Sequence, residues 1–292
     1  MKPFSIVQVS DAHLSPEHAF PTENWKIVAG HINDLAPDLV IHTGDTTVDG
    51  VGNPEQLEFA KEQFALLDAG VLVVPGNHDV GELSSHGNRL EPVVSAESCA
   101  RFEKCFGQDR FVRDIEGWRI VGLNALLFGS GLSIEADLWG FLDETLSSAD
   151  GRRIAVFLHK PLYAEALGDG SRGAHYLDGE SAKRLHLSLS YGDAALVATG
   201  HLHEHRVREF EGVQYVWAPS TSFVTDAVIR APLGTPRVGF VHHQFESDTV
   251  TSTIVCPDDM TTHLFLDHPE FYPEFQEAAR RFIEWKRSNS NG

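Results

Sequence analysis

Short apolar runs alternate with amphipathic segments through the first 75 residues. Residues 4–10, 38–43 and 71–74 are rich in β-favouring apolar residues, so we expect a strand in each. Between them, residues 23–35 and a segment that opens at Asn53 and Pro54 place apolar residues every three or four positions, which predicts two helices. Strand–helix–strand–helix–strand order is typical of βαβ units and a mostly parallel sheet.

The same alternation continues to about residue 200, and then the texture changes. Further strands are expected at 118–123, 154–158 and 194–198, and helices near 95–106, 134–147 and 179–189. Strand-like runs at 205–210, 213–217, 238–245 and 249–255 are separated by short turns, which predicts an antiparallel meander. No linker interrupts the chain, so we expect one domain over 1–256 and a C-terminal extension over 257–292 that ends in an amphipathic helix.

Polar side chains follow five of the expected strands at the point where each strand ends. They are Asp11 and His13, Asp45, Asn77 and His78, His159, and His201 and His203. We expect these strands to lie in one sheet, where the carboxyl ends of parallel strands meet at one edge, so that side chains nearly 200 positions apart can converge there. One such strand end could be an ordinary polar turn, but five of the same chemical kind predict a shared site.

The residue types at these strand ends favour transition metals. Four imidazoles, two carboxylates and one amide oxygen are available beside His78, and no thiolate is among them, so a closed structural zinc site is not expected. Mixed nitrogen and oxygen ligands suit Zn, Fe, Mn, Co or Ni. Seven ligands are too many for one ion and suit two ions that share a carboxylate. Such pairs activate water and stabilise in-line displacement at phosphorus.

The composition limits which binding partners and which cellular compartment we expect. The chain has 42 acidic and 23 basic residues, a formal net charge of −19, so a broad nucleic-acid surface is not expected. The three cysteines form no CxxC motif, and the N-terminus leads directly into a strand without the pattern of a signal peptide. No apolar run approaches the roughly 18 residues of a membrane span. We therefore expect a cytoplasmic protein that does not enter a membrane.

The motifs resemble those of the calcineurin-like metallophosphoesterase superfamily. DAH at 11–13, GD at 44–45, GNHD at 76–79, His159 and GHLH at 200–203 occur in that family's order over about two-thirds of the chain. The resemblance implies an α/β fold with a two-sheet sandwich flanked by helices and metals at its rim. It also implies that Asp11, His13 and His203 hold one ion, that Asn77, His159 and His201 hold the other, and that Asp45 bridges them. His78 matches the histidine that contacts the phosphate and can protonate the leaving oxygen.

Differences from the motifs of individual branches indicate which branch of the superfamily the chain resembles most. Ser/Thr protein phosphatases carry GDxVDRG, whereas residues 44–50 read GDTTVDG, with Val48 and Asp49 where those enzymes have Asp and Arg. The spacing is more similar to bacterial cyclic-nucleotide and glycerophosphodiester phosphodiesterases. We therefore expect hydrolysis of a small phosphodiester by in-line attack of a metal-bridging hydroxide. The alternatives are a phosphomonoesterase or a hydrolase of both ester types, and an inactive metal-binding regulatory module.

Other segments are candidates for the surroundings of the site. Arg172, His175 and Tyr176 lie in a polar loop after His159, where they could contact substrate or solvent. Residues 81–112 could cap the pocket. The amphipathic helix expected at 269–287 could pack on its own domain or form a homo-oligomer contact.

Overall fold

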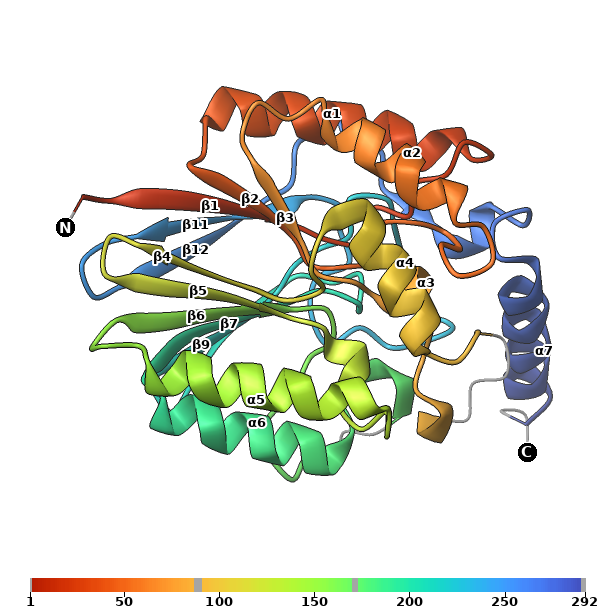
Figure 1. The fold of residues 1–292 in the computed structure, drawn as a ribbon. Helices are drawn as coiled ribbons and strands as arrows, with labels where there is room; N and C mark the ends of the chain where they lie inside the picture. Colours follow the sequence, from red (N-terminus) through yellow and green to blue (C-terminus); the bar gives the residue numbers. More distant parts are fainter. Residues whose placement is uncertain (1, 87–90, 170–172, 290–292) are drawn as a thin grey trace.

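The computed structural model describes residues 2–86, 91–169 and 173–289, and its strands form two main sheets (Figure 1). The first sheet has the order β12–β11–β1–β2–β3. Its strands are β1 (Phe4–Val9), β2 (Leu39–His42), β3 (Val71–Val73), β11 (Phe240–Phe245) and β12 (Val250–Val255). The three N-terminal strands are parallel, as the βαβ pattern predicts.

The second sheet has the order β4–β5–β6–β7–β9–β8. Its strands are β4 (Phe111–Ile115), β5 (Trp118–Leu123), β6 (Arg153–Leu158), β7 (Ala194–Thr199), β8 (Arg206–Phe210) and β9 (Val213–Trp217). Strands β5, β6, β7 and β9 are parallel, and β4 and β8 are antiparallel edge strands. Strand β4 has no counterpart among the predictions, because Arg113 and Asp114 interrupt its apolar run on the exposed edge.

Helices cover the outer face of each sheet, which gives the expected αββα layers. Figure 1 shows α1 (Ala19–Leu35) and α2 (Glu55–Phe64) over the first sheet, and α5 (Ser133–Ser147) and α6 (Gly179–Tyr191) over the second. Between the sheets, a buried cluster that includes the fully buried Ile6, Ile41 and Phe157 forms the inner core. The two-sheet sandwich flanked by helices is therefore confirmed.

The predicted antiparallel meander after residue 204 is wrong. The hairpin β8–β9 joins the second sheet, where β9 lies parallel to β7. The hairpin β11–β12 joins the first sheet, where β11 lies antiparallel to β1. Period-two alternation marks a half-buried strand but says nothing about its partner, so the division between two sheets is invisible in the pattern. The five strand ends that carry candidate ligands likewise come from both sheets: β1, β2 and β3 from one, β6 and β7 from the other.

The remaining elements lie around the carboxyl ends of the parallel strands. They are α3 (Asn77–Val80), α4 (Ala96–Phe106), the two-stranded pair β10 (Phe223–Val224) and β13 (His263–Leu264), and α7 (Pro273–Asn289). Short 3₁₀ turns occupy Ser84–His86, Ala125–Leu127, Gly173–His175 and Phe265–Asp267. Figure 1 shows α7 at the same end of the sandwich as these strand ends. Within the described ranges, no helix has the length and apolarity needed to cross a membrane.

Candidate metal centre

The backbone turns sharply at the candidate ligands. Asp11, His13, Asp45, His201 and His203 all have positive φ, between 45° and 69°. Non-glycine residues in this left-handed region cost about 1–3 kcal/mol each, and such positions concentrate at functional sites. The turns aim successive side chains from different strands at one place.

Glycines let these turns approach one another. A Cβ at Gly76 would clash with the carboxylate and backbone nitrogen of Asp45, and a Cβ at Gly200 would clash with Ser10 and Asp11. The glycines in the GN and GH motifs are therefore steric requirements of the site rather than ordinary turn residues.

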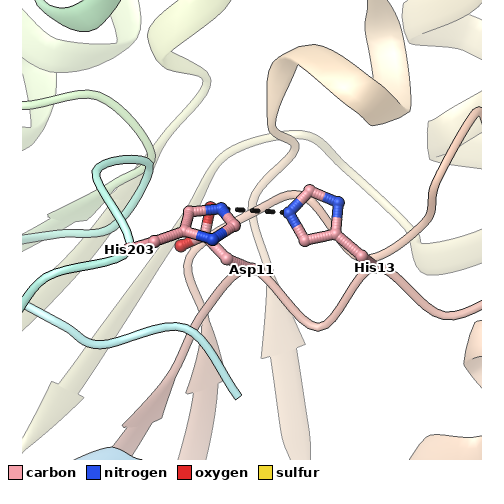
Figure 2. Close-up of side chains that lie close together, drawn as sticks. All are labelled: Asp11, His13 and His203. Atoms are coloured by element: carbon pink, nitrogen blue, oxygen red, sulfur yellow. Dashed lines mark hydrogen bonds and ion pairs between the residues drawn. The ribbon is translucent and has the colours of Figure 1, made fainter. Parts of the chain in front are cut away.

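Asp11, His13 and His203 form the first cluster of candidate ligands (Figure 2). His13 Nε2 lies 3.1 Å from His203 Nε2, and His203 Nε2 lies 3.4 Å from Asp11 Oδ1. All three side chains are buried. Asp11 Oδ2 accepts a hydrogen bond from the backbone of His201, which ties this cluster to the strand end that carries the second one.

Asp45, Asn77, His159 and His201 form the second cluster. His159 Nε2 lies at its centre, 3.2 Å from Asp45 Oδ2, 3.1 Å from Asn77 Oδ1 and 3.0 Å from His201 Nδ1. Asp45 also lies within 4.8 Å of ligand atoms of His13 and His78, so its carboxylate joins the two clusters. All seven predicted ligands are thus brought together.

Hydrogen bonds fix which ring nitrogen of each histidine faces its cluster. His159 Nδ1 donates to the Thr43 carbonyl (2.7 Å), and His203 Nδ1 donates to the Phe223 carbonyl (2.8 Å). His201 Nε2 donates to the Ala174 carbonyl (2.8 Å). In its neutral form, each ring therefore points its other nitrogen into the cluster as an acceptor.

The hydroxyl of Tyr272 fixes the orientation of the His13 ring in the same way. Tyr272 donates its hydroxyl proton to the Val48 carbonyl (3.0 Å) and accepts from His13 Nδ1 (2.8 Å). His13 Nε2 is left as an acceptor only 3.1 Å from the acceptor nitrogen of His203. Lone pairs and carboxylates that face one another at such distances need a cation between them, so the donor set fits metal ions.

Charges in the clusters follow from burial and from their close partners. Burial holds the pKa of His13 and of His201 well below the usual value, so both rings are neutral. Although burial opposes its ionisation, Asp45 keeps a pKa well below its usual range because His159 lies beside it. Burial likewise opposes the charging of His159, but the Asp45 carboxylate raises its pKa to about 9. The second cluster therefore favours positive charge at its centre.

His78 lies beside the clusters on the short helix α3. Its backbone nitrogen donates to Asp45 Oδ1 (2.9 Å), and its Nδ1 donates to the Val48 carbonyl (3.0 Å). Its Nε2 therefore points away from the backbone, 3.6 Å from Glu91 Oε1. A partly exposed imidazole at the edge of the site, with one nitrogen that is not bonded to the backbone, can give or take a proton.

Asp79 supports the turn that carries Asn77 and His78. Its buried carboxylate accepts from the backbone of Gly76 and from the backbones and hydroxyls of Thr46 and Thr47. These bonds join the loop after β2 to the loop after β3, so Asp79 sets the position of the two candidate site residues before it.

A cavity of about 470 Å³ opens beside the clusters. His13, Asp45, Asn77, His78, His201 and His203 contribute to one part of its lining, and helix α7 contributes to another. Tyr272 also lines the cavity, so the C-terminal extension reaches the site of its own chain.

Of the three candidate substrate contacts, the two that the structure describes do not both line the cavity. His175 lines the cavity, with its ring centroid 6.4 Å from that of His201. Tyr176 is buried against Leu202 and Trp217 and does not line the cavity. Arg172 lies outside the described residues.

Several residues at the site were not anticipated from the sequence. Glu91, in the segment expected to cap the pocket, accepts from Asn77 Nδ2 (2.8 Å) and lines the cavity. Lys160 is fully buried next to His159 and pairs with Glu82. Lys160 could have been singled out as a charge at the end of an apolar strand, whereas nothing in the pattern around Glu91 or Tyr272 indicates a site.

The chain is similar to known proteins in sequence and in fold. The model of the calcineurin-like phosphoesterase family matches residues 4–205. A probable glycerophosphodiester phosphodiesterase, GpdQ, from Arcobacter nitrofigilis is 30% identical over 68% of this chain and 71% of its own. A 3′,5′-cyclic-nucleotide phosphodiesterase from Nostoc is 25% identical over 76% of this chain and 79% of its own. A dimetal phosphatase from Danio rerio shares the fold with a TM-score of 0.58 and 15% identity, over 86% of this chain and 95% of that one.

Proposed function

Because the chain belongs to the calcineurin-like phosphoesterase family and is a metal-dependent phosphoester hydrolase, we propose that it hydrolyses a small phosphodiester. The observation that carries the proposal is the set of acceptor atoms that face one another in two clusters joined by Asp45. Relatives named as phosphodiesterases support the choice of ester.

In this proposal Asp11, His13 and His203 hold one ion and Asn77, His159 and His201 hold a second, with Asp45 shared. The donor set suits Mn, Fe, Zn or Co. Bound there, two such ions would make a water molecule acidic enough to attack phosphorus in line and would neutralise charge on the phosphoryl oxygens.

The protein's own residues orient the substrate and move a proton. His78 Nε2 faces the cavity, so we assign it the protonation of the leaving oxygen, while the Val48 carbonyl holds the opposite nitrogen. Acceptors behind the four ligand imidazoles, three backbone carbonyls and the Tyr272 hydroxyl, keep the rings fixed, which limits reorganisation during the reaction.

The charges around the cavity favour a diester over a monoester. A monoester dianion gains from an additional cationic clamp, but the described residues that line the cavity include one cation besides histidine, Arg230. Its guanidinium is already paired with Glu204 Oε1 at 2.5 Å. Glu91 adds a carboxylate near His78, which disfavours a second negative charge on the substrate.

Mn²⁺-loaded protein should hydrolyse bis(p-nitrophenyl) phosphate with a higher kcat/KM than p-nitrophenyl phosphate. A clear preference for the monoester would replace this proposal with the phosphomonoesterase. Comparable values for both would indicate a hydrolase of both ester types. A metal-loaded sample inactive on both would favour the regulatory module.

A further inference from the structure

The cavity beside the clusters has two chemically different ends. One end carries the candidate metal ligands, and the other is formed largely by apolar side chains. Phe275, Ala278 and Phe282 of α7 contribute to the apolar end together with Phe265 and Ile229. We call these five residues the apolar wall. The cavity volume of about 470 Å³ falls in the range of roughly 300–1,000 Å³ that is typical of small-ligand sites.

The apolar wall is held in place by packing and hydrogen bonds of the C-terminal extension. Phe271 is fully buried in a cluster with Phe20, Val48 and Phe223. At the start of α7, Gln276 Nε2 donates to the carbonyls of Phe265 (2.6 Å) and His268 (2.9 Å). At the far end, Lys286 Nζ donates to the Val228 carbonyl (3.1 Å). The wall is therefore tied to the domain at both ends of the helix.

Charges around the wall do not suit a second ionic group on the ligand. The Arg230 guanidinium is paired with Glu204 and donates to the Leu202 carbonyl (2.7 Å), so a second anion meets a cation that is already neutralised. Lys286 Nζ lies 4.5 Å from the centre of the Phe282 ring, which disfavours a ligand cation on that ring. Among the described lining residues, the uncharged polar side chains besides histidine are Asn77, Thr225 and Tyr272.

From these observations we propose that the site takes a phosphoester whose alcohol moiety is uncharged and apolar, and that α7 selects it. This inference rests on the proposed function, because the phosphoryl group would sit at the metal-ligand clusters. The apolar wall lines the same cavity as the metal-ligand clusters. An ester group that extends from phosphorus towards the wall must therefore contact it. Glycerol would leave hydroxyls against carbon, and a quaternary ammonium would place a second cation beside Lys286 at the Phe282 ring.

The expected effect is large enough to measure in binding. Each methylene fully buried from water contributes about fourfold to affinity, and partial burial of a branched butyl group should contribute roughly tenfold. The preference should appear in binding without any turnover, since it arises from contact with α7.

Calorimetry with non-hydrolysable phosphonates tests the proposal on Mn²⁺-loaded full-length protein. The probes are methylphosphonate, 3,3-dimethylbutylphosphonate and 2-(trimethylammonio)ethylphosphonate, the last two being of the same shape but different charge. We expect 3,3-dimethylbutylphosphonate, whose branched alkyl group is uncharged, to bind roughly tenfold more tightly than either of the others. Equal affinities, or tighter binding of the cationic probe, would overturn the proposal.

Two variants of one helix locate the preference. Phe282 lines the cavity and is 38% exposed, whereas Trp285 is 61% exposed and lies outside the lining. Phe282→Ser should remove most of the preference and leave methylphosphonate affinity unchanged, and Trp285→Ser should retain the preference. A preference that survives in a Phe275→Ser/Phe282→Ser double variant would show that α7 is not the selecting wall.

Hydrolysis assays separate this inference from the proposed function. Selective phosphonate binding by a protein that hydrolyses no phosphoester would contradict the proposed function and support the apolar pocket. Hydrolysis of bis(p-nitrophenyl) phosphate with no selectivity among the phosphonates would support the proposed function and contradict the apolar pocket.

Discussion

The hydroxyl of Tyr272 lies 2.8 Å from Nδ1 of His13, although 259 positions separate the two residues. The same hydroxyl donates to the Val48 carbonyl, which also accepts from His78 Nδ1. One residue of the C-terminal extension therefore fixes the ring of a candidate ligand and shares an acceptor with the candidate proton donor. Its ring also contacts that of His78, with the centroids 4.7 Å apart.

Tyr272→Phe should weaken Mn²⁺ binding at the first cluster by about 10–100-fold, because His13 loses the partner that sets its tautomer and orientation. Calorimetric titration of the metal-free protein with Mn²⁺ measures this effect directly. Tyr191, which is 91% exposed, provides the control variant Tyr191→Phe. Unchanged Mn²⁺ affinity in Tyr272→Phe would show that His13 needs no such support.

Asp79→Asn should lower the free energy of unfolding by about 2 kcal/mol, because an amide nitrogen replaces an acceptor that faces several buried donors. Urea unfolding followed by circular dichroism measures the loss. Asp49 makes two hydrogen bonds on a more exposed loop, so Asp49→Asn is a matched control with a smaller expected loss. Equal losses in the two variants would contradict the role of Asp79 in joining the loops.

Much of this arrangement could be predicted from the sequence, because each candidate ligand directly follows an apolar strand. Asp11, Asp45 and His159 could be placed at strand ends without knowing which sheet holds the strand. The two-sheet sandwich is implied by the resemblance of the motifs, whereas the periodicity alone does not indicate it. Alternation in 213–217 and 240–245 looks alike, yet these strands pair in different sheets.

The surroundings of the site could not be predicted, because they depend on how distant segments cross it. Tyr272 contacts His13 only because Phe271 packs into a cluster with Phe20 and Phe223. Amphipathic spacing in the last helix shows that one face is buried, but not that part of this face lines a cavity. Glu91 accepts a hydrogen bond from Asn77, 14 positions before it, and no periodic pattern in the sequence around Glu91 indicates this contact.

Glu82→Gln should destabilise the fold by about 3 kcal/mol, because it leaves the fully buried Lys160 without its closest opposite charge. Adding Lys160→Met should restore part of the loss, since both charges are then gone. Urea unfolding of the two single variants and the double variant gives the coupling between the residues. Additive losses would show that the pair is not coupled.

Asn77→Ala should reduce metal content from two ions per chain to about one, because the second cluster loses an oxygen ligand beside His159. Elemental analysis after Mn²⁺ loading and gel filtration measures the content. Asn53 lies on an exposed loop and donates to Asp49, so Asn53→Ala should keep both ions. Two ions retained in Asn77→Ala would refute the assignment of Asn77.

His78→Asn should lower kcat by about 10²–10⁴-fold while both ions stay bound, because the change removes the proton donor and none of the proposed ligands. The loss should depend on the leaving group. Nitrophenolate leaves without help, so bis(p-nitrophenyl) phosphate should suffer least, whereas a diester with only alkyl leaving groups should suffer most. His31→Asn, on an exposed ring that contacts Asp259, is the control and should retain full activity. Equal losses on both kinds of diester would mean that His78 holds the phosphate without protonating the leaving oxygen.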